Sequence, residues 1–234
     1  MADTYHFSAP GRTEIGGNHT DHQHGCVLAA AVDMETTAEV TLTGTNIIRV
    51  DSEGYKPVEI DLNDLDARES EKNTTAALIR GVAAAFAQRG YKLSGFEAKV
   101  RSTVLPGSGL SSSAAFEVLL VCILDGLYNG SILDGVTRAK ISQWVENNYF
   151  GKPSGLMDQS ACSIGGLVGI DFKYADPLLA VRYSKAPDYP DATLAALGEM
   201  VRQTGAPEFD EVDGDPRLVR GTVVRHLMLP GALE

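Results

Sequence analysis

The chain has 234 residues and a formal net charge of −11, and 44% of its residues are hydrophobic. This composition supports a buried core, which excludes a largely disordered chain, and the acidic balance excludes the basic surface of a nucleic-acid-binding protein. Three scattered cysteines, an N-terminus without a leader pattern and no apolar run of about 20 residues predict a soluble cytoplasmic protein without a membrane span.

Strands followed by helices are expected over the first two thirds of the chain. Alternating apolar residues predict strands over residues 37–43, 46–51, 58–62, 96–103 and 166–171. The alanine-rich residues 75–89 predict a helix that ends at Gly90. Residues 114–128 are apolar on almost every face and predict a buried central helix, and Asp134 can cap a further helix that reaches Tyr149. The order of elements favours an α+β fold.

The loop before the predicted central helix carries the strongest chemical signal. Its glycines let the backbone approach a ligand, and the unpaired N–H groups of the following helix form an anion site. It lacks the Gly-Lys-Ser/Thr ending of a Walker A motif, so a different way of binding phosphate is expected. A flexible linker is the alternative, but the apolar helix that follows at once argues against it. The predicted phosphate-binding residues are Pro106, Gly107, Ser108, Gly109, Leu110, Ser111, Ser112 and Ser113.

Two further segments contain candidate site residues. Residues 11–22 read Gly-Arg-Thr-Glu-Ile-Gly-Gly-Asn-His-Thr-Asp-His, and residues 151–159 read Gly-Lys-Pro-Ser-Gly-Leu-Met-Asp-Gln. A carboxylate such as Asp21 can accept hydrogen bonds from two neighbouring sugar hydroxyls, and a turn residue is the equally open alternative. A zinc site is the alternative for the histidines of this region, which are His19, His22 and His24.

These three segments resemble the GHMP kinase superfamily and, within it, the galactokinases. The loop matches the pattern Pro-x-x-x-Gly-Leu-Ser-Ser-Ser-Ala in full. The segment at residues 11–22 resembles the galactokinase signature, with Asn18 where the family has Glu and His22 where it usually has Tyr. The resemblance covers about residues 7–171. It implies a GHMP kinase N-terminal domain, which is a mixed sheet covered by helices and an α+β fold shared with a ribosomal protein domain.

The activity implied by this resemblance is ATP-dependent phosphorylation of a sugar, galactose to galactose 1-phosphate. Asp158 matches the carboxylate at the acceptor hydroxyl, and Arg12 matches its cationic neighbour. The matching sugar-binding positions are Asn18, His19 and Asp21.

The resemblance also implies a metal cofactor, since Mg²⁺ bridges the phosphates of ATP in phosphoryl transfer. Ser113 and Glu146 match its ligands. The expected partners are a hexose and ATP, with no nucleic acid and no membrane. Two alternatives stay open: a non-catalytic sugar- and ATP-binding protein of this type, and another GHMP small-molecule kinase. The sequence leaves the oligomeric state open.

The remaining residues, 172–234, follow a different pattern. A proline-containing polar stretch precedes a predicted helix over residues 191–204 and a predicted strand over residues 222–229. The segment is similar to the C-terminal part of radical SAM activating enzymes, but without the Cys-x-x-x-Cys-x-x-Cys signature it implies no radical chemistry. We expect residues 1–171 to form a truncated kinase domain and residues 172–234 an unrelated, poorly packed tail. Phosphoryl transfer is expected to be impaired, because an open cleft admits water.

Overall fold

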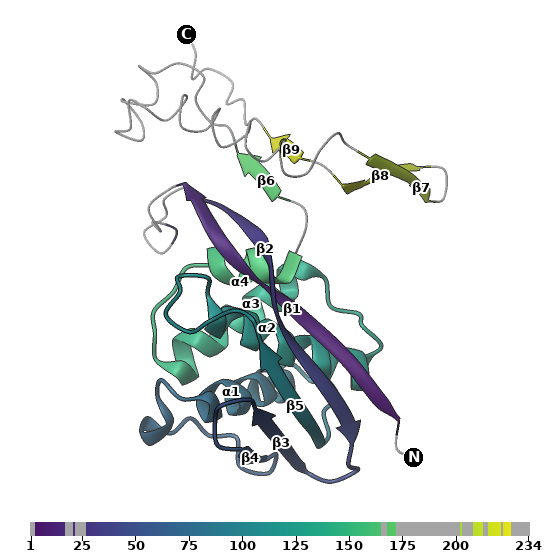
Figure 1. The fold of residues 1–234 in the computed structure, drawn as a ribbon. Helices are drawn as coiled ribbons and strands as arrows, with labels where there is room; N and C mark the ends of the chain where they lie inside the picture. The colour runs from purple at the N-terminus through teal and green to yellow at the C-terminus, as the bar shows by residue number, and fades with distance from the viewer. Residues whose placement is uncertain are drawn as a thin grey trace.

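A computed structural model of the chain shows a five-stranded sheet with helices packed on one face (Figure 1). The strands of this sheet are β1 (Thr4–Gly16), β2 (Leu28–Leu42), β3 (Ile47–Ser52), β4 (Val58–Asp61) and β5 (Phe96–Ser102). The structure describes residues 3–16, 21, 27–164, 168–171, 202, 208–212, 215–220 and 222–225.

The strand order in the sheet is β1-β2-β5-β3-β4. Neighbouring strands are antiparallel except for β3 and β5, which pair in parallel, so the sheet is mixed as the family resemblance implies. The sequence predicts β3, β4 and β5 to within a residue or two of their bounds. It predicts only the second half of β2, and it does not predict β1, where Pro10, Gly11 and a register shift interrupt the alternating pattern.

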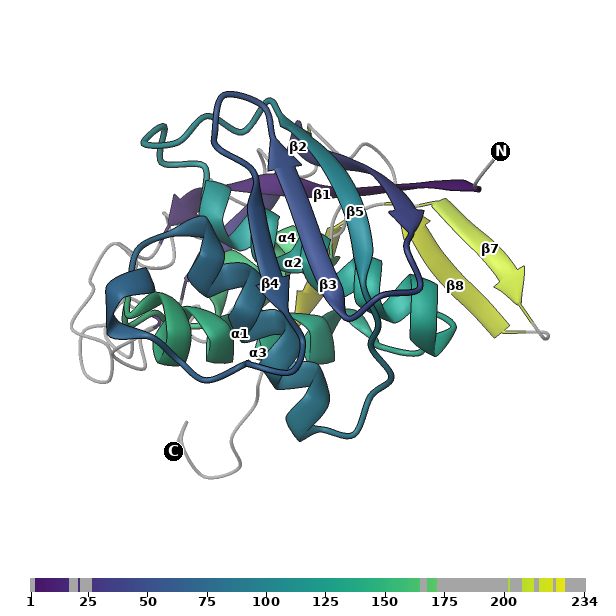
Figure 2. The same ribbon diagram turned by 90° about the horizontal axis from the view of Figure 1, so that it is seen from below.

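The core lies between the sheet and the helices, and Figure 2 shows the strands β3, β4 and β5 in front of the helices on which they pack. Alternate residues of the central strands point into it, as the period of two requires, while their neighbours point to the open face. These inward residues include Ala38, Val40, Ile48, Val50, Phe96, Ala98 and Val100.

Four helices lie on the inner side of the sheet, and the third of them packs against the other three. They are α1 (Thr75–Gln88), α2 (Ser112–Leu124), α3 (Gly135–Val145) and α4 (Met157–Ile164). The first three confirm the predicted helices, and α2 is the buried central helix. The Asp134 side chain accepts a hydrogen bond from the Thr137 N–H at 2.7 Å, which confirms the predicted cap of α3.

The sequence does not predict α4, nor the way in which α2 and α3 end. Both helices widen into a five-residue π-turn, η3 (Asp125–Asn129) after α2 and η4 (Glu146–Phe150) after α3, and both turns close on a glycine with positive φ. The helices predicted from the sequence, which extend to residue 128 and to Tyr149, are longer because they include these turns. A short 3-10 helix, η2 (Glu69–Glu71), precedes α1.

The structure describes four further short strands outside the five-stranded sheet. β6 (Val168–Asp171) pairs in parallel with β9 (Thr222–Arg225), and β7 (Glu208–Val212) forms an antiparallel hairpin with β8 (Asp215–Arg220). The predicted strand at residues 222–229 contains β9, whereas the hairpin is not predicted. The predicted helix at residues 191–204 lies outside the described residues, apart from Arg202. Within the part of the chain that the structure describes, no helix is long and apolar enough to cross a bilayer.

The helical layer also encloses a hydrogen-bonded cluster of fully buried polar side chains, which are Glu117 of α2, Glu146 of η4 and Gln159 of α4. The Gln159 amide nitrogen donates to Glu117 Oε2 at 3.3 Å and to Glu146 Oε2. Burial raises the pKa of Glu117 well above its ordinary value, and the neighbouring charge of Glu146 raises it further. Folding therefore favours the neutral acid form of Glu117 relative to the unfolded chain.

Replacing this acid by its amide tests the protonation state. Below about pH 4.5 the carboxyl is neutral in both the folded and the unfolded chain. Above that pH the unfolded chain releases the proton and the folded chain keeps it, so Glu117 lowers stability increasingly as the pH rises towards its folded pKa. Glu117→Gln cannot ionise. The melting temperature of the variant relative to the parent chain should rise between pH 5 and pH 8 in thermal melts. A difference that stays constant over this range would contradict the assignment.

Candidate active site

The predicted phosphate loop connects β5 to the N-terminus of α2. Gly107 and Gly109 have φ angles of 76° and 78°, and Ser111 also lies in the left-handed region with φ 56° and ψ 58°. A Cβ atom at either glycine would meet nothing within 4 Å. The glycines are therefore required by the backbone conformation rather than by close packing, and the space in front of the loop is open.

The N-terminus of α2 has no side-chain cap. Ser111 occupies the cap position, but its side chain makes no capping hydrogen bond to the helix. The first N–H groups of a helix have no intrahelical partners, and the helix dipole adds partial positive charge at this end. An uncapped N-terminus beside an open loop has the geometry and charge that bind an anion.

The loop meets the two predicted catalytic residues directly. Arg12 Nε donates to Asp158 Oδ1 at 2.7 Å, and the two side chains are each 7% exposed. Arg12 NH1 donates to the Gly109 carbonyl at 2.6 Å, and the Ser111 hydroxyl donates to Asp158 Oδ2 at 2.6 Å. Residues that are far apart in sequence, from β1, the loop and α4, thus form one connected hydrogen-bonded group.

The position of Arg12 depends on the irregular course of β1. The pairing of β1 with β2 shifts register between Pro10 and Arg12, and the Arg12 N–H donates to the Leu110 carbonyl of the loop at 3.0 Å. A Cβ atom on Gly11 would lie 3.0 Å from that carbonyl and from both methyl groups of Val104. Gly11 therefore allows the loop to lie directly against the strand.

Ser113 and Glu146, the predicted metal ligands, are also adjacent. Ser113 Oγ donates to Glu146 Oε1 at 3.1 Å, and Lys152 Nζ lies 3.4 Å from the same oxygen. Glu146 begins the π-turn η4, and its carbonyl accepts the N–H groups of Gly151 and Lys152. Turns of this kind are rare and occur often at functional sites. The pair offers a hydroxyl and a carboxylate oxygen, which are the ligand types that Mg²⁺ prefers.

The sugar-binding prediction is only partly placed. Asp21 Oδ2 accepts the Met157 N–H at 2.9 Å, so this carboxylate lies at the N-terminus of α4, next to Asp158. Its other oxygen, Oδ1, is buried and has no hydrogen-bond partner among the described residues. Asn18 and His19 lie outside the described residues, as do His22 and His24 of the zinc alternative.

Several residues of this site have no role in the sequence-based prediction. Lys152 and Gln159 lie in the segment of residues 151–159, but the sequence-based prediction assigns them no function. Glu117 lies outside all three segments of that prediction. One signal was available for Glu117, since it is the only charged residue in the apolar run of α2. No comparable signal marks the link from Ser111 to Asp158, which depends on a contact between distant segments.

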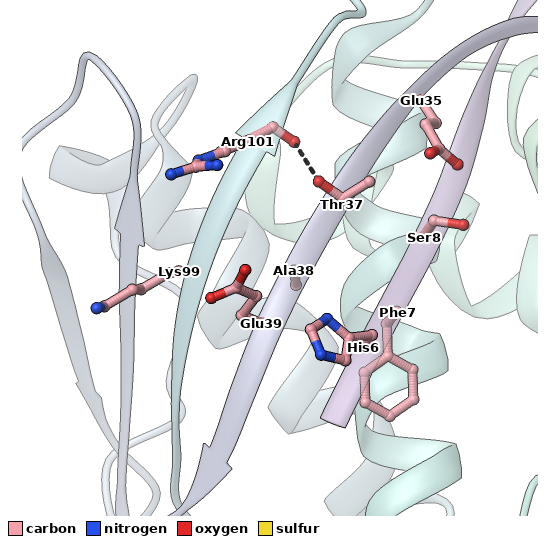
Figure 3. Close-up of a pocket in the computed structure, with 9 residues that line it drawn as sticks. All are labelled: His6, Phe7, Ser8, Glu35, Thr37, Ala38, Glu39, Lys99 and Arg101. Atoms are coloured by element: carbon pink, nitrogen blue, oxygen red, sulfur yellow. Dashed lines mark hydrogen bonds between the residues drawn. The ribbon is translucent and has the colours of Figure 1, made fainter. Parts of the chain in front are cut away.

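Two other features do not belong to this site. Burial raises the pKa of the Cys162 thiol to about 12, so this cysteine, which follows Asp158 by one turn of α4, is not a nucleophile at neutral pH. A shallow hollow of about 350 Å³ lies on the open face of the sheet, where charged side chains such as Glu39, Lys99 and Arg101 border it (Figure 3). That face is opposite the helices and the loop, and its lining is an ordinary solvated sheet surface.

Comparison with known proteins agrees with the motifs. The family model for the N-terminal domain of GHMP kinases matches residues 77–166, and the model for the galactokinase galactose-binding signature matches residues 2–42. The chain is 38% identical over 170 residues to the galactokinase of Streptomyces coelicolor and 34% identical over 161 residues to that of Bacillus subtilis. These matches cover 70% and 68% of the chain but only 43% and 41% of the relatives, so the chain spans less than half of their length.

Solved structures give the same result for the fold. The galactokinase of Lactococcus lactis complexed with galactose matches with a TM-score of 0.64 and 28% identity, over 70% of this chain and 42% of that chain. A D-glycero-D-manno-heptose 1-phosphate kinase from Bacteriodes thetaiotaomicron matches with a TM-score of 0.63 over 87% of this chain and 77% of that chain, at 17% identity. At that identity the second match shows the fold alone. The N-terminal part of this chain is a GHMP kinase N-terminal domain that carries the galactose-binding signature of galactokinases.

Proposed function

We propose that the chain carries the catalytic groups of a galactokinase-type sugar kinase, which transfers the γ-phosphoryl group of ATP to a hydroxyl of galactose, and that this truncated chain does so at an impaired rate. One observation carries the proposal. The hydrogen-bonded group of Arg12, Asp158 and Ser111 brings a buried carboxylate into direct contact with a loop that has the geometry of a phosphate site. A proton acceptor beside a phosphate site is the arrangement that phosphoryl transfer to a hydroxyl requires.

In the proposed reaction the sugar hydroxyl oxygen forms a bond to the γ-phosphorus, and the bond from phosphorus to the bridging oxygen breaks to release ADP. Asp158 accepts the hydroxyl proton. The guanidinium group of Arg12 balances the charge of this buried carboxylate, and its positive charge also offsets negative charge on the transferred group. The Ser111 hydroxyl fixes the second oxygen of Asp158.

The nucleotide phosphates are proposed to bind at the loop and at the N-terminus of α2, where the helix dipole favours negative charge. Mg²⁺ fits the oxygen pair of Ser113 and Glu146, and when bound it would neutralise charge on the phosphates. The ammonium group of Lys152 lies beside the same carboxylate and adds positive charge on the phosphate side.

Galactose is the proposed acceptor because the matching signature and the galactose complex of the Lactococcus lactis enzyme both point to it. Asp21 supports this choice, because its unpartnered buried oxygen lies next to the segment that carries Asp158 and can accept a bond from a sugar hydroxyl. Asn18 and His19 are proposed as further sugar contacts from the family resemblance. The division into a kinase unit at residues 1–171 and a separate tail at residues 172–234 is likewise a proposal.

The acceptor role of Asp158 predicts a large loss of activity in Asp158→Asn. The amide can still accept a bond from Arg12 but cannot take the hydroxyl proton. ADP release with galactose, measured in a coupled assay, should fall by about 10² to 10⁴-fold. The rise in melting temperature on adding Mg-ATP should persist. A parent chain that responds to Mg-ATP and galactose in melts but releases no ADP would favour the non-catalytic alternative.

The geometry of Arg12 predicts that its charge alone is insufficient. Lysine keeps the charge in Arg12→Lys but lacks the planar fork whose separate nitrogens bond Asp158 and the Gly109 carbonyl. Loss of one charged hydrogen bond, worth about 1.5–3 kcal/mol, should lower kcat/KM by roughly 10 to 100-fold. The measurement is steady-state ADP release at varied galactose and ATP. Full activity in Arg12→Lys would show that the two-point contact is unimportant.

A further inference from the structure

The buried polar cluster of Glu117, Gln159 and Glu146 lies directly beneath the candidate site. Glu117 follows Ser113 by one helical turn on α2, so the two side chains lie on the same face of that helix. Gln159 follows Asp158 on α4. The cluster therefore connects the three elements that supply the candidate phosphate, proton-acceptor and metal groups.

The hydrogen bonds of the cluster show how it acts on Glu146. One Glu146 oxygen, Oε2, accepts from the Gln159 amide, which leaves Oε1 to face Ser113 and Lys152. The amide group of Gln159 has two N–H donors, and the second goes to Glu117 Oε2. Both donors are thus committed, and the position of the Gln159 side chain is fixed from two sides.

Stability does not account for Glu117. Its side chain is fully buried, and its second oxygen has no hydrogen-bond partner among the described residues. A buried polar atom without a partner costs free energy, and an apolar side chain of the same shape at such a position is often neutral or stabilising. An acid at this position in an otherwise apolar stretch of helix therefore needs another explanation.

We propose that Glu117 is a positioning residue that acts through Gln159 to hold the Glu146 carboxylate in the orientation that binds the metal of Mg-ATP. This inference rests on the proposed kinase function. Residues that hydrogen-bond a metal ligand without touching the metal fix its orientation, and their loss typically weakens metal affinity by about 10 to 100-fold. Gln159 hydrogen-bonds the predicted metal ligand Glu146 directly, and Glu117 acts on the Glu146 carboxylate through Gln159.

Three variants of the full chain test the proposal. Glu117→Met removes the hydrogen bond and keeps the size and burial of the side chain. Glu117→Gln keeps an acceptor for the Gln159 amide and is the conservative rescue. Ile60→Ala opens a cavity in the core at β4, away from the site, and is the control for a general loss of stability.

The readout is the thermal midpoint at fixed ATP, first with EDTA and then with increasing Mg²⁺. The increase above the EDTA value isolates the contribution of the metal, because a ligand that binds the native state raises the midpoint. For Glu117→Met the half-saturating Mg²⁺ concentration should rise about 10-fold, while the shift caused by ATP with EDTA stays as in the parent. Glu117→Gln and Ile60→Ala should both keep the parent's half-saturating concentration.

The outcomes separate this proposal from the proposed function. A parent-like half-saturating concentration in Glu117→Met would overturn the positioning role and leave the kinase assignment intact. An equal rise in the half-saturating Mg²⁺ concentration in Ile60→Ala would also overturn the positioning role, because the weaker metal binding would then follow from lower stability alone. No response of the parent chain to Mg-ATP would overturn the proposed function, and the positioning role with it.

Discussion

The buried ion pair between Arg12 and Asp158 is the constraint around which the site is arranged. Moving two charges out of water costs more than their attraction returns unless further hydrogen bonds satisfy them. Here the Gly109 carbonyl and the Ser111 hydroxyl supply such bonds, one to each partner. The loop must therefore stay against β1 and α4 for the pair to remain buried, and the same closeness brings the carboxylate to the predicted phosphate position.

The conformation of Ser111 follows from this requirement. A non-glycine residue with positive φ is unusual, and such strain persists only where the surroundings impose it. A serine before a helix would ordinarily cap it, but this hydroxyl is directed to Asp158 instead. The helix N-terminus consequently stays uncapped, which leaves its N–H groups for an anion. The Ser111 side chain thus has two effects. It hydrogen-bonds the predicted proton acceptor Asp158, and because it does not cap α2, it leaves the helix N–H groups available to the predicted phosphate site.

The sequence predicts those parts of the fold in which local patterns and burial agree. Strands β3, β4 and β5 and helices α1 and α2 have clear periodicity, and Asp134 marks the start of α3 by an ordinary cap. Strand β1 is missed because its proline, glycine and shifted register serve the loop contact of Arg12 rather than regular pairing. Within the site, local motifs supply the candidate residues, but the pairing of Arg12 with Asp158 spans 146 positions and no spacing rule predicts it. The family resemblance was needed to connect them.

The first residue of the π-turn η4 and the acid in α2 meet in the polar layer beneath the site. Glu146 keeps the regular helical conformation at the end of α3, and the wider turn follows it, so that its carbonyl accepts the Gly151 N–H while its carboxylate contacts Ser113 and Gln159. Gln159 in turn needs a second acceptor for its amide, and Glu117 provides it from the opposite helix. The buried acid, unfavourable alone, thus contributes to holding one Glu146 carboxylate oxygen beside the N-terminus of α2.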